Sequence, residues 1–132
     1  MESDVPNFVG KALIVDDNIA LARVTQFALN RAGLETSLAG NGRLALERCA
    51  AENFDIVISD QQMPEMTGLE FLSRLRALPA YALTPIILLT AKGLELELPR
   101  IQQELNIDAV FPKPFSPSAV VETACKLLGV AV

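Results

Sequence analysis

The sequence predicts an α/β fold: a doubly wound, five-stranded parallel sheet with helices on both faces. Five short apolar runs alternate with five segments in which apolar residues recur at helical spacing. This alternation is typical of strand–helix–strand units, whose crossovers are right-handed. The 132 residues suffice for one domain with a sizeable core. We expect residues 1–9 to form a leader and residues 10–132 to form that domain.

The five predicted strands are the short apolar runs. The first run is continuously apolar from Ala12 to Val15, as expected for a buried strand, whereas the second alternates with polar residues and should lie at a sheet edge. The predicted strands span residues 11–15, 34–38, 54–59, 85–90 and 109–112. In the flavodoxin-like strand order 2-1-3-4-5, the first and third strands flank the switch point at which such folds bind ligands.

The five predicted helices begin or end at recognisable signals. Gly33 stops the first helix, and Ser116-Pro117 supplies a capping hydroxyl and a proline to start the fifth. Pro99 interrupts the apolar stripe of the fourth helix. We expect that helix to begin near Pro99, because an interior proline costs about 3 kcal/mol. The predicted helices span residues 18–32, 43–52, 69–78, roughly 99–106 and 116–128.

Polar residues follow four of the apolar runs at the point where each predicted strand ends. They are the pair Asp16-Asp17, then Asp60, Thr90 and Lys113. Ligands bind at the carboxyl ends of the strands in an open parallel sheet, so these side chains should share one pocket. A single Asp or Thr after a strand is usually a turn residue or a helix cap. The prediction depends on their coincidence at corresponding strand ends.

This group of side chains suits a divalent cation and a phosphoryl group. Magnesium prefers a few protein carboxylates together with water and phosphate oxygens, which fits Asp16, Asp17 and Asp60 better than a calcium cage would. An Asp carboxylate can also act as a nucleophile and form an acyl phosphate. Lys113 would add positive charge beside the same oxygens, and the Thr90 hydroxyl could donate to one of them.

Composition excludes several other functions. The chain has no histidine, which removes His-dependent nucleophile schemes, His-ligated zinc and a phosphohistidine carrier. The formal charge of −5 argues against direct binding of nucleic acid. No apolar run is long enough to span a bilayer and no signal peptide is present, so we expect a cytoplasmic protein. Cys49 and Cys125 should be reduced, and they should lie on opposite faces of the sheet, out of disulfide range.

Four motifs surround these polar residues: Leu13-Ile14-Val15-Asp16-Asp17-Asn18, Ser59-Asp60-Gln61-Gln62-Met63-Pro64-Glu65-Met66-Thr67-Gly68, Leu89-Thr90-Ala91 and Lys113-Pro114-Phe115. In these motifs the chain resembles the receiver domains of two-component response regulators, and the resemblance extends over residues 13 to about 128. The resemblance implies that Asp60 is the phosphoacceptor and that Mg²⁺ is held by Asp16, Asp17, Asp60 and the backbone carbonyl of Gln62. It implies Thr90 as the switch hydroxyl, Lys113 as the phosphate-contacting lysine, and a cis peptide bond between Lys113 and Pro114.

The same resemblance implies partners. Asp60 would take its phosphoryl group from a sensor histidine kinase or a phosphotransfer protein, and the phosphorylated form would bind a downstream protein target. Such a domain is a regulatory module that at most catalyses its own phosphorylation and dephosphorylation. A homodimer, and a fragment of a longer regulator or hybrid kinase, both stay open. The alternative function is a receiver-fold adaptor that binds partners without phosphorylation.

Three features affect how such a domain would signal: two differ from the usual family pattern, and one borders the predicted site. Val110 stands where the family usually has Tyr or Phe, so either the usual coupling of threonine to an aromatic ring is altered or Val110 simply packs in the sheet. Leu96, with Glu95 and Glu97, forms either a partner surface or a poorly ordered loop. The resemblance also implies that Gln62 and Lys92 tune the lifetime of the phosphoryl group.

Overall fold

The computed structural model describes residues 8–91 and 97–130 and contains the predicted five-stranded parallel sheet. The strand order is β2-β1-β3-β4-β5, and all four pairings are parallel. The strands are β1 (Gly10–Val15), β2 (Leu34–Ala39), β3 (Ile56–Asp60), β4 (Ile86–Thr90) and β5 (Ala109–Pro112). This order confirms the doubly wound fold class and places β2 at an edge of the sheet.

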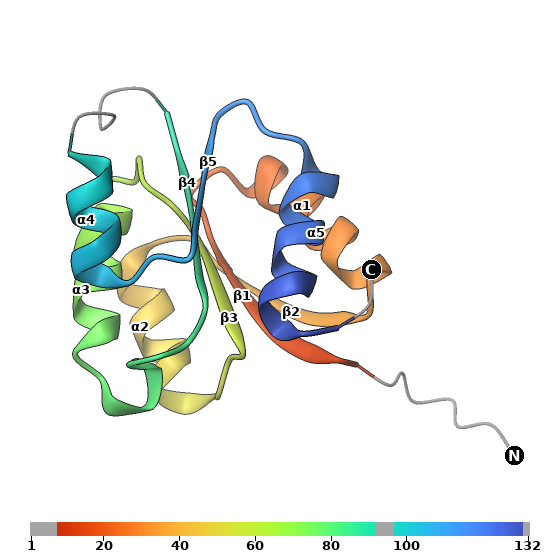
Figure 1. Ribbon diagram of the computed structural model, residues 1–132, viewed down its shortest axis with the longest axis horizontal. Coiled ribbons are helices and arrows are strands. Elements are labelled where there is room, and N and C mark those ends of the chain that lie inside the picture. The colour runs from red at the N-terminus through yellow and green to blue at the C-terminus, as the bar shows by residue number, and fades with distance from the viewer. Residues whose placement is uncertain (1–7, 92–96, 131–132) are drawn as a thin grey trace, which may run out of the picture.

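Helices cover both faces of this sheet, as Figure 1 shows: α1 and α5 lie on one face, and α2, α3 and α4 lie on the other. The helices are α1 (Ile19–Arg31), α2 (Gly42–Ala51), α3 (Gly68–Arg76), α4 (Leu98–Leu105) and α5 (Pro117–Leu128), with a short 3₁₀ turn, η1 (Pro79–Tyr81). No helix in these described ranges is long and apolar enough to cross a membrane.

Two hydrophobic cores result, one on each face of the sheet. Alternate strand residues enter different cores: Leu13 packs with α2 and α3, whereas Ile14 packs with α1 and α5. Cys49 belongs to the first core and Cys125 to the second, and both are buried and free. The prediction that the sheet separates the two thiols is confirmed.

Two predicted boundaries need comment. The third strand was expected from residue 54, but it begins at Ile56, because the buried Phe54 donates its backbone N–H to the Tyr81 hydroxyl and not to a strand (3.3 Å). Helix α4 begins at Leu98 with Pro99 in its first turn, as predicted. Glu97 is the exposed N-cap of α4, whereas Glu95 and Leu96 lie outside the described residues.

Val110 and Phe111 occupy opposite faces of β5. Val110 packs against the core under α2, α3 and α4, and Phe111 packs against the core under α1 and α5. Successive side chains of a strand point to opposite faces, so Phe111 does not replace an aromatic ring at position 110.

Candidate functional site

The polar residues predicted from the strand ends do meet at one edge of the sheet. Asp16 directly follows β1, Asp60 and Thr90 are the last residues of β3 and β4, and Lys113 directly follows β5. The Lys113 ammonium lies 2.6 Å from Asp60 Oδ1. The structure therefore brings the predicted lysine onto the predicted phosphoacceptor.

Strand register accounts for this convergence. Asp60 on β3 pairs with Leu89 on β4, and Thr90 pairs with Pro112 on β5, so each functional side chain emerges within one residue of the same sheet edge. Backbone hydrogen bonds extend the alignment beyond the strands, since the Lys113 N–H donates to the Thr90 carbonyl at 2.9 Å. Parallel pairing thus places residues that are distant in sequence side by side.

Three carboxylates form an acidic cluster at this edge. One oxygen from each of Asp16, Asp17 and Asp60 lies within 4.8 Å of the others. Asp16 and Asp60 are buried, and Asp17 is exposed to solvent. Like charges at this separation in a partly desolvated place are stabilised by a cation among them.

Burial controls the titration of the two buried carboxylates. It raises the pKa of Asp60, and the adjacent Lys113 ammonium partly opposes that rise. Burial likewise raises the pKa of Asp16, against the backbone N–H of Asn18, which donates to Asp16 Oδ1 at 2.9 Å. Both carboxylates would gain from a further positive charge at the site, because it favours their ionised forms.

The cluster fits a hard divalent cation. Asp60 Oδ1 is fully buried, and its contact with Lys113 is an ion pair without the directional geometry of a hydrogen bond. This oxygen therefore retains capacity for another positively charged partner. Asp16, Asp17 and Asp60 supply the oxygen donors that Mg²⁺ prefers. The backbone carbonyl of Gln62 stays a prediction as a further ligand.

The loop after Asp60 is held by contacts that the sequence did not identify. A side chain on Gly68 would place its Cβ against the Asp60 carbonyl oxygen, closer than a Cβ can approach, so only glycine fits where α3 meets β3. The Gln61 side chain accepts the Leu69 N–H at 2.7 Å and ties the loop to the first turn of α3. Gly68 was part of the sequence motif, but its role depends on how closely α3 approaches the end of β3. The spacing of residues in the sequence does not reveal that distance.

Thr90 lies at the site with its hydroxyl turned along its own chain. It donates to the Ala91 carbonyl at 3.0 Å. The Gln62 side chain reaches the same place: its Nε2 lies 3.5 Å from Thr90 Oγ1, and its Oε1 accepts the Ala91 N–H at 3.0 Å. Gln62 therefore contacts the last residue of β4 and the residue after it, whereas Lys92 lies outside the described residues.

The peptide bond between Lys113 and Pro114 is cis, as predicted. Lys113 leaves β5 at this bond and points its ammonium at Asp60.

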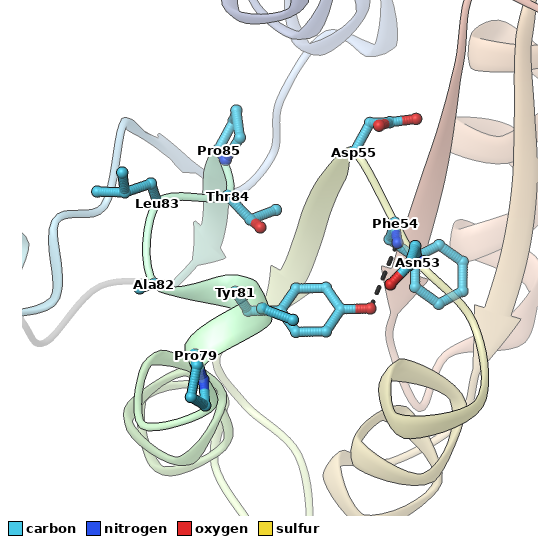
Figure 2. A pocket seen from close by; sticks show the side chains of 10 residues that line it. Asn53, Phe54, Asp55, Pro79, Tyr81, Ala82, Leu83, Thr84 and Pro85 are labelled. Atoms are coloured by element: carbon cyan, nitrogen blue, oxygen red, sulfur yellow. Dashed lines mark hydrogen bonds between the residues drawn. The ribbon is translucent and has the colours of Figure 1, made fainter.

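A separate hollow lies at the opposite end of the sheet, where β3 and β4 begin. Figure 2 shows its lining, with the Tyr81 hydroxyl accepting the Phe54 N–H. Tyr81 is buried and its hydroxyl also lies 2.6 Å from the Glu52 carbonyl oxygen, so it closes the amino end of the sheet. None of the strand-end polar residues lines this hollow.

Comparison with known proteins connects the site with a family. The family model "Response regulator receiver domain" matches residues 12–124. The transcriptional regulatory protein SrrA of Staphylococcus aureus is 38% identical over 110 residues, which are 83% of this chain and 44% of SrrA. The chain thus spans less than half the length of that curated relative.

Solved structures give the same answer for the fold. The Vibrio cholerae chemotaxis protein CheY4 superposes with a TM-score of 0.82 at 33% identity, covering 89% of this chain and 98% of CheY4. The signal receiver domain of a histidine kinase from Syntrophus aciditrophicus superposes with a TM-score of 0.82 at 29% identity, covering 91% of this chain and 90% of that domain.

Proposed function

This chain belongs to the receiver domains of two-component response regulators, and from that premise we propose that it is a phosphorylation switch in which Asp60 accepts the phosphoryl group. Domains of this family act in phosphorelay signalling, generally bind Mg²⁺ at an acidic site, and interact with histidine kinases and downstream effectors. The observation that carries the proposal is the ion pair between Lys113 and the buried Asp60, within an acidic cluster.

The proposed reaction is a transfer from a phosphohistidine to Asp60. One Asp60 carboxylate oxygen forms the new bond to phosphorus while the phosphorus–nitrogen bond breaks. The electron pair of the phosphorus–nitrogen bond stays on the nitrogen of the donor's imidazole. The ring leaves as neutral imidazole because its other nitrogen carries a proton. Mg²⁺, when bound by Asp16, Asp17 and Asp60, would neutralise charge on the transferring group.

The chain's own residues would prepare this step in two ways. Lys113 opposes the rise in the pKa of Asp60 that burial causes, and so favours the ionised carboxylate, which is the nucleophile that the step needs. Its ammonium also lies where it can pair with the incoming phosphoryl oxygens. The surrounding core excludes water from most of the Asp60 side chain, which is 2% exposed, so the electrostatic interactions there are strong.

The output would follow from the added charge. A phosphoryl group brings about −1.5 to −2 charges at neutral pH, and it would attract the Thr90 hydroxyl. Movement of Thr90 would alter the segment that leads to α4 and shift the population of a form that binds its target. SrrA is named a transcriptional regulator, and we propose that this chain's own output passes through contact with a protein target.

A second function keeps one observation in its favour. Val110 supplies no aromatic ring to follow the movement of Thr90, and it packs into the sheet surface. A receiver-fold adaptor that recognises partners without phosphorylation would need no such ring. This alternative leaves the convergence of Asp16, Asp17, Asp60 and Lys113 without a purpose, and we therefore place it second.

Intact-mass spectrometry after incubation with acetyl phosphate tests the first function. We expect one added phosphoryl group that requires Mg²⁺ and is absent in Asp60→Asn. Asp55→Asn is the matched control, since Asp55 lies at the amino end of β3 and accepts the Lys11 N–H there. An unmodified protein, under conditions that label another receiver domain, would move the adaptor to first place.

A further inference from the structure

The side chain of Gln62 joins the loop after the phosphoacceptor to the end of β4. Its Oε1 accepts the Ala91 N–H at 3.0 Å, and its Nε2 lies 3.5 Å from Thr90 Oγ1, the outer limit of a hydrogen bond. Gln62 follows Asp60 by two residues. Its side chain therefore connects the loop after β3 to the Ala91 backbone and to the Thr90 hydroxyl, which would respond to phosphorylation.

These contacts compete with the role proposed for Thr90, which is to donate a hydrogen bond to a phosphoryl oxygen on Asp60. A hydroxyl has a single proton to donate. The Thr90 proton goes to the Ala91 carbonyl at 3.0 Å. If Thr90 is to donate to a phosphoryl oxygen on Asp60, it must give up this bond, and rotation of the hydroxyl would also strain the long contact with the Gln62 amide.

We propose that Gln62 is a positioning residue, a latch that holds the Thr90–Ala91 segment with the Thr90 proton donated to the Ala91 carbonyl. Phosphorylation releases the latch when Thr90 turns to the phosphoryl oxygen. The inference rests on the proposed function, because it assigns a residue to the switching step that follows phosphorylation of Asp60.

The chain offers a reason for this assignment. Val110 has no ring or hydroxyl that could respond to Thr90, and Phe111 enters the core on the other face of the sheet. The bond from the Ala91 N–H to Gln62 supplies a direct connection instead. Ala91 directly follows Thr90, so release of Gln62 would free the backbone amide next to the hydroxyl that responds to phosphorylation.

Two variants separate the parts of the latch. Gln62→Met keeps the length of the side chain and removes both hydrogen-bonding groups, whereas Gln62→Glu keeps an acceptor for the Ala91 N–H and loses the donor to Thr90. Gln61→Met is the matched control, because the Gln61 side chain accepts the Leu69 N–H and makes its contact with α3.

The first measurement is amide hydrogen exchange of Ala91 by NMR in the protein without added ligand. We expect the Ala91 N–H to lose protection in Gln62→Met and to keep it in Gln62→Glu and in Gln61→Met. A merely destabilising effect would speed exchange throughout the sheet instead. Unchanged protection of Ala91 in Gln62→Met would overturn the latch, whatever the result of any phosphorylation experiment.

The second measurement is the affinity for beryllofluoride, a phosphoryl analogue, in the presence of Mg²⁺. Because the analogue must displace the latch, we expect Gln62→Met to bind it about five-fold more tightly, the factor that one ordinary hydrogen bond represents. In a Thr90→Val background no hydroxyl needs release, and the gain should shrink to below about two-fold.

The outcomes distinguish the latch from the function on which it rests. If the wild-type protein binds beryllofluoride and Gln62→Met binds it equally or more weakly, the latch is wrong and the phosphorylation switch stands. If the wild-type protein binds no beryllofluoride and takes no phosphoryl group from acetyl phosphate, the switch fails and the latch fails with it.

Discussion

Arg76, at the end of α3, makes the densest set of side-chain hydrogen bonds to the backbone in the described part of the fold. Its guanidinium donates to four carbonyl oxygens at 2.7 to 2.8 Å. The four acceptors belong to Tyr81, Thr84, Leu105 and Asn106. One side chain therefore fastens the α3–β4 connection to the carboxyl end of α4, and we predict that Arg76→Met strongly destabilises the domain.

The expected loss in the free energy of unfolding follows from how exposed each of the four hydrogen bonds is. The bonds to Tyr81, Thr84 and Leu105 are partly buried, and the bond to Asn106 is exposed. Hydrogen bonds from a charged donor contribute about 1.5–3 kcal/mol each. Desolvation, which lowers the pKa of Arg76, opposes part of this gain. Counting about 1 kcal/mol net for each partly buried bond gives a loss of about 3 kcal/mol from a typical 5–15 kcal/mol.

Urea unfolding followed by circular dichroism measures this loss. With a slope of about 2 kcal/mol per molar urea, the midpoint should fall by about 1.5 M. Arg76→Lys should lose less, because an ammonium can still reach some of the carbonyls. Arg74→Met, at an exposed position of the same helix, is the control and should change the free energy of unfolding by less than about 0.5 kcal/mol. A loss below about 1 kcal/mol in Arg76→Met would refute the reasoning.

Two further predictions concern the site loop and the thiols. Gly68→Ala should cost about 2 kcal/mol and slow labelling by acetyl phosphate, because its Cβ would meet the Asp60 carbonyl, whereas Gly40→Ala meets no atom within 4 Å. Equal unfolding midpoints for the two variants would contradict this. Burial raises the pKa of Cys49 to about 11, so at pH 8 roughly one thiol in a thousand is ionised. Cys49 and the buried Cys125 should resist Ellman's reagent until urea is added, and rapid reaction of the native protein would show that a thiol is accessible.

The sequence was sufficient to predict the strand ends and therefore which polar residues gather at one edge of the sheet. Apolar runs identify buried strands, and the geometry of parallel sheets requires the residues after them to meet at one edge. Asp60 and Lys113, which are 53 positions apart in the printed sequence, are thus brought to within 2.6 Å of each other. The doubly wound topology, which puts the second and fifth helices on opposite faces of the sheet, separated Cys49 from Cys125 without any contact being known.

Other features depend on where side chains meet backbone across connections, and no periodicity encodes that. In the sequence, Arg76 cannot be distinguished from other polar residues at the end of a helix. Only the structure shows that it donates to backbone carbonyls from two separate connections. Phe54 was predicted to begin a strand because it adjoins an apolar run, but the Tyr81 hydroxyl takes its N–H. The contact of Gln62 with Ala91 likewise requires two loops to be placed relative to each other.

The two ends of α4 are held differently, and this bears on how a change at Asp60 can travel. The carboxyl end is fixed by charged hydrogen bonds from Arg76 to the carbonyls of Leu105 and Asn106. The amino end follows a segment whose start is held at Ala91 by a neutral side-chain amide, a weaker interaction than a charged one. The free energy needed to release Gln62 from Ala91 should therefore be smaller than that needed to release Arg76 from α4, so a change at Asp60 should free the Thr90–Ala91 segment before it disturbs the carboxyl end of α4.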